Sequence, residues 1–357
     1  MRKKNRISLL LINNGYPSSE NPQYSTYVRS IEECLYDAGT EVDLLVLDTS
    51  FKGTISKYLN YLKFFWRLSL FNYQPYDYIY INNYPYFFLP LMLRIRRFNN
   101  LIIHWHGTDI MAQSRSKRIL NKISYKFLPK THFAIAPSKY FAAKVVDKIG
   151  SRRLNNIFVS PSGGVDIDKF SIQPKKKTNT IILGYASSLT TAKGADLIMR
   201  LGARLPILRN CCNVDLNLKV IAYGAERDYY VSQLKLNKTV IVVNPLSKNK
   251  MNLFYNSIDV FLFPTKRKAE SLGLVGLEAM SCGKPVVGTN DFALKEYIIP
   301  GETGELFEID DYDDFEKAII RTIKNLKNYK PRALVVDKYS KGAVVKQYKK
   351  IFNAFNQ

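Results

Sequence analysis

Residues 259–288 read DVFLFPTKRKAESLGLVGLEAMSCGKPVVG, and this stretch sets the pattern for the whole chain. It opens with a short apolar run, 259–263, which predicts a buried strand closed by a proline turn. A second apolar run, 285–288, predicts the next strand. Between the two lie a glycine-containing loop and one short helix. This order of strand, loop, helix and strand is typical of a parallel sheet with crossover helices.

The same alternation runs through the rest of the 357 residues, a length that favours two domains over one core. Apolar strands are predicted at 7–12, 42–47, 77–82, 101–106, 132–137, 181–186, 217–223 and 239–244. Helical stretches between them include 26–38, 138–149, 192–204 and 314–327. A polar, basic, proline-containing stretch at 169–180 predicts a linker between a domain at 1–168 and a second at 181–336. The tail, 337–357, is predicted to be helical.

Two acidic side chains, Glu270 and Glu278, stand eight residues apart around the start of the helix in the opening stretch. A loop that leads into a helix offers free backbone N–H groups and the positive end of the helix dipole, which suits a phosphate. Carboxylates accept hydrogen bonds from hydroxyl groups. The pattern therefore predicts a ligand with phosphate at one end and a polyol around it, such as a nucleotide sugar. The plain alternative is a surface helix with two solvated acids.

The glutamate pair and the following Ala-Met-Ser-Cys-Gly-Lys-Pro-Val, residues 279–286, resemble the donor-site motif of the retaining glycosyltransferases of family 4. The resemblance extends from Ile7 to the last helix and fits the bacterial surface-polysaccharide type. It implies the GT-B fold: two Rossmann-like domains, each with a doubly wound parallel sheet, facing a cleft, with the last helix crossing back to the first domain. It also implies that Glu270 contacts hydroxyls of the donor sugar and Glu278 those of the ribose.

The resemblance also indicates which residues hold the donor diphosphate. Lys193 stands at a phosphate-clamping lysine of the family, whereas Ser188 stands where an arginine is expected. A serine supplies one hydrogen bond but no charge, so Arg267 and its two lysine neighbours are candidates to compensate; the alternative is a solvated basic loop. Backbone N–H groups complete the expected diphosphate site, at Leu272, Gly273, Leu274 and Val275.

In the first half of the chain, candidate residues follow predicted strands, where ligands of open α/β sheets bind. Gly15 and Tyr16 follow the first strand, at a place where the family has a glycine loop for the donor phosphates. The run His-Gly-Thr-Asp, 106–109, resembles an acceptor-domain motif in which His106 reaches the donor sugar and Asp109 borders the acceptor. The alternatives are an ordinary turn after the first strand and a structural histidine.

No metal ion or other cofactor is expected. His104 and His106 have the spacing of metal ligands, but no third ligand of suitable spacing follows them. Asp311 and Asp313 match the Asp-x-Asp pattern of metal-dependent enzymes. They directly precede a helical pattern, where acids are favoured as caps, and we interpret them as capping residues.

The chain carries 53 Lys and Arg against 30 Asp and Glu, and a net charge of +23 predicts an anionic partner, either nucleic acid or acidic lipid. In residues 115–130, four basic residues recur at four-residue spacing, which predicts a basic stripe on one face of a membrane-docking helix. They are Arg118, Lys122, Lys126 and Lys130. Apolar residues on the neighbouring face are expected to pack inward, among them Ile119 and Ile123. Aromatic residues at 61–66 are either a second anchor or core.

The four cysteines form no Cys-x-x-Cys motif, which suits reduced thiols in the cytoplasm, and the first apolar run is too short for a signal peptide. We therefore expect a retaining, metal-independent hexosyltransferase, peripheral on the inner face of the cell membrane. It would transfer sugar from a UDP- or GDP-sugar to a saccharide or lipid-linked saccharide during surface-polysaccharide synthesis, without binding nucleic acid. Two alternatives stay open: a GT-B sugar-nucleotide epimerase and a basic nucleic-acid-binding protein.

Overall fold

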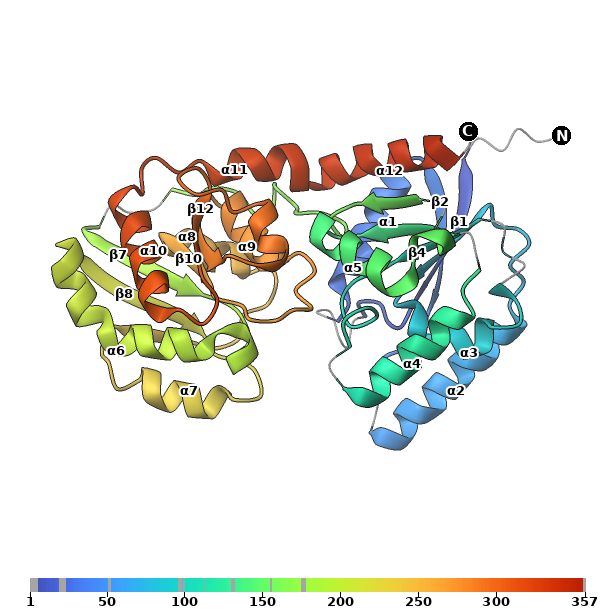
Figure 1. The fold of residues 1–357 in the computed structure, drawn as a ribbon, viewed down its shortest axis with the longest axis horizontal. Coiled ribbons are helices and arrows are strands. Elements are labelled where there is room, and N and C mark those ends of the chain that lie inside the picture. Colours follow the sequence, from blue (N-terminus) through green and yellow to red (C-terminus); the bar gives the residue numbers. More distant parts are fainter. Residues whose placement is uncertain are drawn as a thin grey trace. The chain divides into compact units, whose positions relative to one another are not determined.

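The structure is a computed structural model that describes residues 6–18, 24–50, 53–95, 98, 100–112, 114–129, 132–154, 156–174 and 178–355. The chain forms two compact units. One comprises Met1–Gly164 together with Lys341–Gln357, and the other comprises Val165–Ser340. Each unit contains one parallel sheet with helices on both faces (Figure 1).

The first unit is built on six strands whose order in the sheet is β2-β1-β3-β4-β5-β6. They are β1 (Ile7–Asn13), β2 (Thr40–Val46), β3 (Tyr78–Asn82), β4 (Leu101–His104), β5 (Phe133–Ala136) and β6 (Asn156–Val159). Along β1, Leu9 and Leu11 face one core cluster, whereas Leu10 and Ile12 face the other, because side chains alternate across a strand. The sheet is therefore covered on both faces, as expected for a doubly wound domain.

The helices of the first unit divide between these two faces. The helices are α1 (Thr26–Asp37), α2 (Thr54–Leu70), η1 (Tyr84–Tyr86), α3 (Phe88–Leu91), α4 (Arg115–Lys126), α5 (Lys139–Ile149), η3 (Ser151–Arg153) and the C-terminal α12 (Lys341–Phe355). Helices α1 and α12 pack together on one face, while α2, α4 and α5 contribute to the cluster on the other.

The second unit repeats this plan with the strand order β12-β11-β10-β7-β8-β9. Its strands are β7 (Thr180–Tyr185), β8 (Asp215–Ile221), β9 (Val240–Val243), β10 (Val260–Phe263), β11 (Val286–Thr289) and β12 (Gly304–Phe307). The direction of winding reverses between β7 and β10, and such a switch point is where ligands of doubly wound sheets bind. The opening stretch of the sequence therefore supplies β10, one of the two strands at the switch point. The sequence analysis did not predict β6 or β12.

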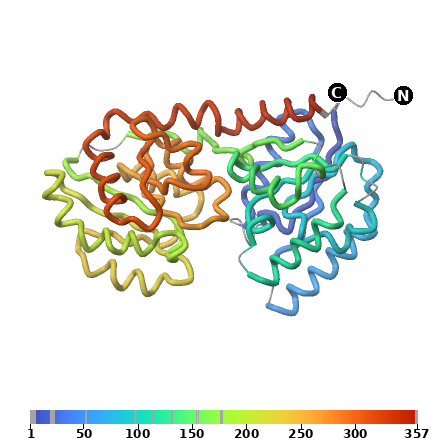
Figure 2. Tube along the Cα trace, in the orientation of Figure 1, coloured from blue at the N-terminus to red at the C-terminus, as the bar shows by residue number. Residues whose placement is uncertain are grey.

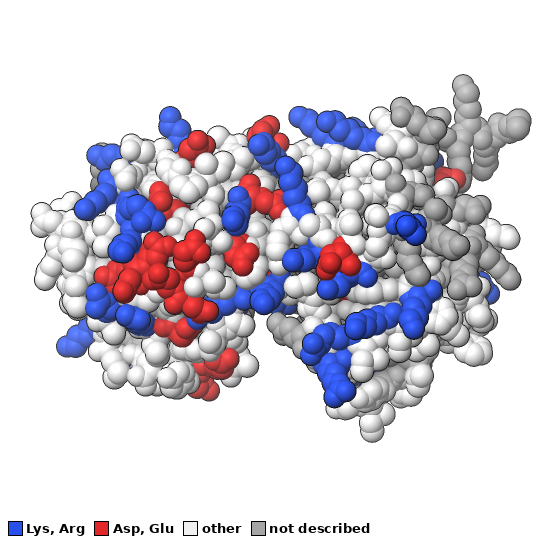
Figure 3. Space-filling model, viewed as in Figure 1, with Lys and Arg blue, Asp and Glu red and all other residues white. Residues whose placement is uncertain are grey.

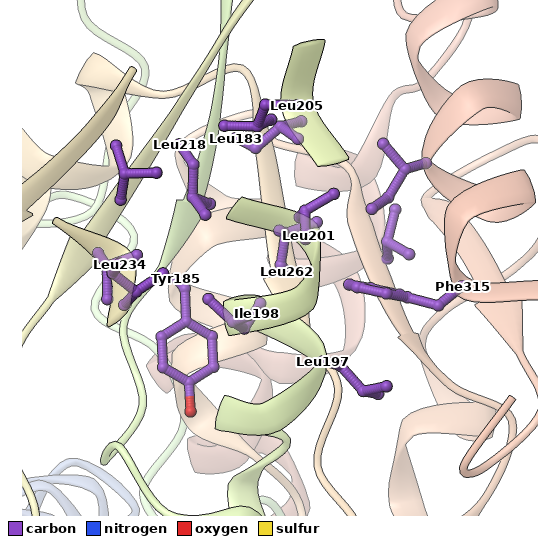
Figure 4. Packing of buried hydrophobic residues seen from close by; sticks show 14 of the residues in the cluster. Leu183, Tyr185, Leu197, Ile198, Leu201, Leu205, Leu218, Leu234, Leu262 and Phe315 are labelled. Carbon is purple, nitrogen blue, oxygen red and sulfur yellow. The ribbon is translucent and has the colours of Figure 1, made fainter. Parts of the chain in front are cut away.

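The core on one face of the second sheet consists mainly of aliphatic side chains from its strands and covering helices, with the aromatic rings of Tyr185 and Phe315 among them (Figure 4). The helices of this unit are η4 (Thr191–Lys193), α6 (Ala195–Cys212), α7 (Arg227–Leu234), α8 (Met251–Ser257), α9 (Leu274–Ser281), η5 (Phe292–Glu296), α10 (Tyr312–Lys324), α11 (Pro331–Leu334) and a π-helical turn, η6 (Val335–Tyr339). The expectation of two doubly wound parallel α/β domains is confirmed.

The segment expected to be a linker, 169–180, is largely part of the second unit. Phe170 is buried in the core of that unit, and its carbonyl oxygen accepts hydrogen bonds from Ser281 Oγ (2.5 Å) and Arg332 Nη1 (2.9 Å). The units divide after Gly164 and after Ser340, whereas the sequence analysis divided the chain after 168 and 336. The side chains that donate these hydrogen bonds to the backbone of the segment lie far along the chain, so the composition of the segment does not reveal them.

The expected single helix over 337–357 is interrupted. Ser340 has an extended backbone (φ −70°, ψ 158°) between the π-helical turn and α12, and its hydroxyl donates to the carbonyl oxygen of Val336 at 2.8 Å. After this break α12 belongs to the first unit (Figure 2), where Tyr348 and Phe352 are buried. Tyr348 also lies 3.0 Å from Tyr80 between their hydroxyl oxygens. Within the described residues no helix is both long and apolar enough to cross a bilayer.

Candidate functional site

Two loops at the switch point of the second sheet bring a lysine and a glutamate together. Lys193 ends the short helix that follows β7, and Glu270 lies in the loop that follows β10. The loops meet closely because Gly194 has a positive φ (+76°), and a Cβ atom at this position would lie 2.0 Å from the carbonyl oxygen of Pro264. Only glycine allows this approach, so the local sequence Lys193-Gly194 positions the lysine.

Lys193 Nζ forms an ion pair with Glu270 Oε2, and both side chains are mostly buried. Thr265 Oγ1 also donates to Glu270 Oε2 at 3.4 Å, and the ammonium group lies 5.8 Å from the centre of the Phe263 ring. The two residues that the sequence assigned to the diphosphate and the sugar are thus in direct contact. An anionic ligand at Lys193 would compete with Glu270 for the same ammonium group.

Helix α9 begins directly after this loop. Its N-cap, Gly273, has φ +79°, and a Cβ atom there would lie 2.5 Å from the Phe263 ring. The first N–H groups of a helix lack intrahelical acceptors, and they carry the positive end of its dipole. The predicted diphosphate donors lie at this end of α9: Leu272 and Gly273 are buried, whereas Leu274 and Val275 are partly exposed.

The second carboxylate, Glu278, lies two turns further along α9. Its Oε2 accepts a hydrogen bond from the hydroxyl of Tyr255 at 3.0 Å, and Tyr255 itself is fully buried. Burial raises the pKa of the Glu278 carboxyl, while the positive charges of Lys248 and Lys169 oppose that shift. Tyr255 therefore fixes the orientation of this carboxylate from the core side.

A tyrosine that the sequence analysis did not single out lies near both glutamates. Burial, followed by the negative charges of Glu270 and Glu278, raises the pKa of the Tyr223 phenol. Tyr223 follows the end of β8, the strand next to β7, and its ring is partly exposed. The rule that ligands bind beyond the carboxyl ends of strands was the available signal for this residue.

Of the three basic residues before Glu270, Lys266 and Arg267 differ in their contacts with the described residues. Lys266 Nζ contacts Asp196 Oδ2 at 2.7 Å and Asp310 Oδ1 at 2.6 Å, so its charge is already paired. Lys266 could reach a ligand only by giving up these two carboxylates. The Arg267 side chain is partly buried and forms no ion pair or hydrogen bond with the described residues. Arg267 therefore remains the candidate, because Ser188 contributes no charge.

In the first unit polar side chains surround His106, which follows β4. Its Nε2 lies 2.7 Å from Oδ1 of Asn82, the last residue of β3, and Ser162 Oγ lies 3.5 Å from its Nδ1. The Tyr27 ring is 4.8 Å away and the His104 ring 4.0 Å away, between ring centres. Burial lowers the pKa of His106 to about 3, so the ring is neutral at pH 7. Its Nε2 proton is directed to Asn82.

Asp109 is buried beneath the loop that carries His106. Its carboxylate accepts backbone N–H groups of His106 (2.9 Å), Gly107 (2.7 Å) and Ile110 (3.1 Å). Burial raises its pKa to about 6, while these backbone bonds oppose the shift. The expectation that Asp109 borders the acceptor directly is thereby corrected, since its side chain has 1% exposure and shapes the loop from within.

The other two predicted residues of the first unit also have inward contacts. A Cβ atom at Gly15 would lie 2.2 Å from the Tyr24 ring, so this position requires a glycine. The Tyr16 hydroxyl donates to Glu32 Oε2 on α1, and Arg29 lies 5.3 Å from the centre of its ring. The structure therefore gathers His106 with Asn82, Tyr27 and Ser162, and not with Tyr16. Asn82 is the last residue of a predicted strand, so the rule that ligands bind at the carboxyl ends of strands could have identified it. No local signal in the sequence indicated Tyr27 or Ser162.

The two acids of the Asp-x-Asp pattern, Asp311 and Asp313, lie at the start of α10. Asp311 is the N-cap of α10, where Oδ1 accepts the backbone N–H of Asp314 at 2.9 Å, and Asp313 lies 3.8 Å from an Arg200 nitrogen. The interpretation of Asp311 as a helix cap is confirmed. Among the described residues no three His, Cys, Asp or Glu side chains come close enough to hold a metal ion.

The fold and the loops at the switch point define the class of protein. Solved structures of glycosyltransferases share the architecture over nearly the whole chain: sucrose-phosphate synthase from Thermosynechococcus elongatus has a TM-score of 0.75 at 19% identity and covers 98% of this chain and 99% of its own. Anabaena Alr3699/HepE, solved with UDP and glucose, has a TM-score of 0.70 at 16% identity, with coverage of 98% and 100%. The fold of this protein is therefore GT-B.

The sequence comparisons concern mainly the second unit. Residues 166–342 match the family model of "Glycosyl transferases group 1", which spans that unit almost from end to end. A D-inositol 3-phosphate glycosyltransferase of Pseudarthrobacter chlorophenolicus is 29% identical over 48% of this chain and 43% of its own length. The capsular polysaccharide biosynthesis glycosyltransferase CapM of Staphylococcus aureus is 24% identical over 63% and 52%. The chain thus spans about half the length of these relatives, and the comparisons favour neither the epimerase nor the nucleic-acid-binding alternative.

Proposed function

We propose that this protein transfers a sugar from a UDP- or GDP-sugar to a saccharide or lipid-linked saccharide, with retention at the anomeric carbon. The single observation that supports this most strongly is the Lys193–Glu270 contact beside the N-terminus of α9, at the switch point of a GT-B domain. One cation, a set of helix N–H groups and two carboxylates form a site for a diphosphate flanked by hydroxyl-bearing rings.

In this proposal the donor rearranges the ion pair. The diphosphate oxygens accept hydrogen bonds from the Lys193 ammonium group and from the first N–H groups of α9. Arg267 supplies a second positive charge. Glu270 then accepts hydrogen bonds from hydroxyls of the transferred sugar, and Glu278, oriented by Tyr255, accepts those of the ribose. As the bond between the sugar and the diphosphate breaks, negative charge accumulates on the phosphate, so these fixed donors stabilise the transition state.

The reaction is proposed to need no metal ion, because Lys193, Arg267 and the helix N-terminus provide the positive charge. Activity is therefore expected to persist in excess EDTA. Loss of activity that Mg²⁺ or Mn²⁺ restores would contradict this part of the proposal.

The acceptor is proposed to be recognised by the first unit, where His106 presents a neutral ring held by Asn82. The names of several relatives support a role in surface-polysaccharide synthesis. CapM is described as a capsular polysaccharide enzyme, and WaaB, a lipopolysaccharide outer core galactosyltransferase, shares the fold with a TM-score of 0.71 at 14% identity.

A lipid-linked acceptor requires contact with the membrane, and we propose that the protein is peripheral on its cytoplasmic face. The side chains of Arg118, Lys122 and Lys126 are exposed on α4, and Figure 3 shows Lys and Arg gathered over this helix. Lys130 lies outside the described residues. Each basic residue near an anionic surface adds about 1 kcal/mol of attraction.

The structure corrects one expectation about this helix. Leu120 and Phe127 pack against the core as expected, whereas Ile119 and Ile123 are exposed. The inward face also includes Asn121, Ser124 and Tyr125. The reason is that Asn121 donates to the carbonyl oxygens of Thr108 and Asp109, which fixes the rotation of α4 about its axis.

A panel of nucleotide sugars in a thermal-shift assay tests the donor, because a ligand that binds only the folded state raises the melting temperature. One UDP- or GDP-sugar is expected to stabilise the protein, and incubation with that donor and a saccharide acceptor to yield a glycoside with the donor's anomeric configuration. Conversion of the donor to an epimer without acceptor would contradict the proposal. So would the absence of stabilisation by every nucleotide sugar.

A further inference from the structure

Helix α2 carries large apolar side chains along the face that is turned away from the core. The five are spaced three or four residues apart, so they form one stripe about 22 Å long. They are Ile55, Leu59, Leu62, Trp66 and Leu70, with exposures of 78%, 51%, 65%, 70% and 60%. We call this set the α2 stripe.

The core does not account for the α2 stripe. Phe64 and Leu68, on the opposite face of the helix, are buried in the core of the first unit, and Tyr61 and Phe65 pack beside them. A surface helix normally has one apolar face toward the core and a polar face toward water. Helix α2 has two apolar faces, and exposing large apolar side chains in a continuous row marks a contact surface.

All charged side chains of α2 and α4 are basic. Lys63 and Arg67 border it on α2, and neither α2 nor α4 contains an acidic residue. Helix α2 packs against α3, and the Phe88 ring of α3 lies 5.8 Å from Phe127 at the end of α4. The three helices thus occupy the same side of the first sheet (Figure 1). The acidic Asp48 lies near Lys63, but the charged residues of both helices are basic, so an apolar row on α2 is complementary to lipid chains beneath anionic headgroups.

We propose that α2 lies in the plane of an anionic bilayer, with the α2 stripe inserted at the boundary between headgroups and acyl chains. This inference rests on the proposed function only in that it needs a membrane partner. Lys63 and Arg67 reach the headgroups, since long basic side chains extend from an apolar surface toward polar surroundings. The exposed basic residues of α4 supply long-range attraction, whereas the α2 stripe supplies the apolar contact that salt does not screen.

Trp66 provides a direct readout of insertion. The protein has two tryptophans, and the other, Trp105, is fully buried in the core. With vesicles of equal parts phosphatidylglycerol and phosphatidylcholine, the Trp66 emission is expected to shift to shorter wavelength. Lipids brominated on their acyl chains should quench it, and aqueous iodide should quench it less than in the absence of vesicles. Trp66→Phe should abolish all three changes, because Trp105 is shielded in either state.

Substitution separates the contributions of the two helices. Leu59→Gln with Leu62→Gln is expected to weaken vesicle binding about tenfold, and to leave the fold intact because both residues are exposed. Leu236→Gln with Leu253→Gln, two leucines of the second unit with exposures of 80% and 62%, is the matched control and should bind as wild type. Lys122→Glu with Lys126→Glu should reduce pelleting with anionic vesicles sharply, whereas Lys324→Glu with Lys327→Glu should reduce it little.

The outcomes are distinguishable. Binding to anionic vesicles without quenching of Trp66 by brominated lipid would overturn insertion of the α2 stripe and leave electrostatic docking in place. Absence of any vesicle binding would overturn both membrane statements, while the donor thermal shift would still report separately on sugar transfer. Self-association without lipid that Leu59→Gln with Leu62→Gln abolishes would show that the stripe contacts a second copy, and would also overturn the inference.

Discussion

At the scale of single residues, the charged groups of the candidate donor site already have partners within the protein. Glu270 and Lys193 neutralise each other at the switch point, and Glu278 is oriented by a buried tyrosine. Breaking one partner of a mostly buried pair leaves the other charge uncompensated, whereas an incoming diphosphate replaces the lost partner. The effects of substituting the two glutamates are therefore expected to differ.

The first prediction concerns these glutamates. Glu278→Ala is expected to weaken donor binding by about 1.5–3 kcal/mol, because a hydrogen bond to a charged group is lost. Glu270→Ala should retain donor binding, since Lys193 is then free for the diphosphate, but turnover should fall markedly. Donor affinity by calorimetry and initial rates by product analysis measure the two effects. Glu302→Ala, an exposed acid of the same unit, is the control, and wild-type turnover in both glutamate variants would refute the assignment.

The second prediction concerns pH and His106. Burial lowers its pKa to about 3 from 6.5 in an unfolded chain, so the unfolded state takes up the proton first as pH falls. The stability linked to the neutral ring is therefore fully present above about pH 6.5 and is lost progressively toward pH 3. In His106→Gln, the loss of unfolding free energy between pH 7 and 5 should be smaller by about 2 kcal/mol. Urea unfolding at several pH values measures this; identical pH profiles would contradict it.

At the scale of elements, helix termini decide how the loops at the switch points are arranged. The loop between β7 and α6 turns at Gly194, α9 begins at Gly273, and α10 begins at Asp311, whose side chain accepts an N–H group of the first turn. The first two termini bring backbone close to the candidate ligand site. At the third terminus Asp311 caps α10, and this capping contact explains the first acid of the Asp-x-Asp pattern.

The third prediction follows from that cap. Asp311→Ala is expected to lower the unfolding free energy by about 1 kcal/mol, because one N–H group of α10 loses its acceptor. Asp313→Ala, whose carboxylate is exposed and 3.8 Å from Arg200, should change stability little. Denaturant unfolding measures both. Neither variant should alter the response of activity to EDTA. A loss of activity in Asp313→Ala that excess Mg²⁺ or Mn²⁺ restores would support the metal-binding interpretation instead.

At the scale of the whole molecule, the chain passes from the first unit to the second after Gly164 and returns after Ser340. The return is marked by the pairing of Val165 with Ser340, so both passages lie next to each other in the second unit. Helix α12 then completes the first core, where it packs on α1. The first unit thus depends on residues that follow the second in sequence.

The fourth prediction tests this dependence. Tyr348→Ala is expected to lower the unfolding free energy by about 3–5 kcal/mol, because the ring is fully buried against α1 and its hydroxyl contacts Tyr80. Lys349→Ala, exposed on the same helix, serves as the control. Thermal unfolding should show the loss, whereas stabilisation by the donor should persist, because Lys193, Glu270 and Glu278 lie in the second unit. Loss of donor stabilisation in Tyr348→Ala would contradict this separation.

The sequence by itself determined the architecture, and it marked the residues of the candidate site at the second switch point. Alternating apolar runs and helical stretches are local properties of the chain, and they predict parallel sheets because each crossover needs a helix. The Lys-Gly pair at 193–194 and the spacing of Glu270 and Glu278 are also local features of the sequence. They could therefore be identified as candidates before the structure was known.

Only the tertiary structure decided which of these groups meet and which face inward. The pairing of Lys193 with Glu270, of Lys266 with Asp196 and Asp310, and the burial of Asp109 each depend on segments distant in sequence. The rotation of α4, and with it the exposure of Ile119, depends on hydrogen bonds from Asn121 to a loop. Periodicity shows that a helix has faces, but packing against the rest of the unit selects the face that is buried.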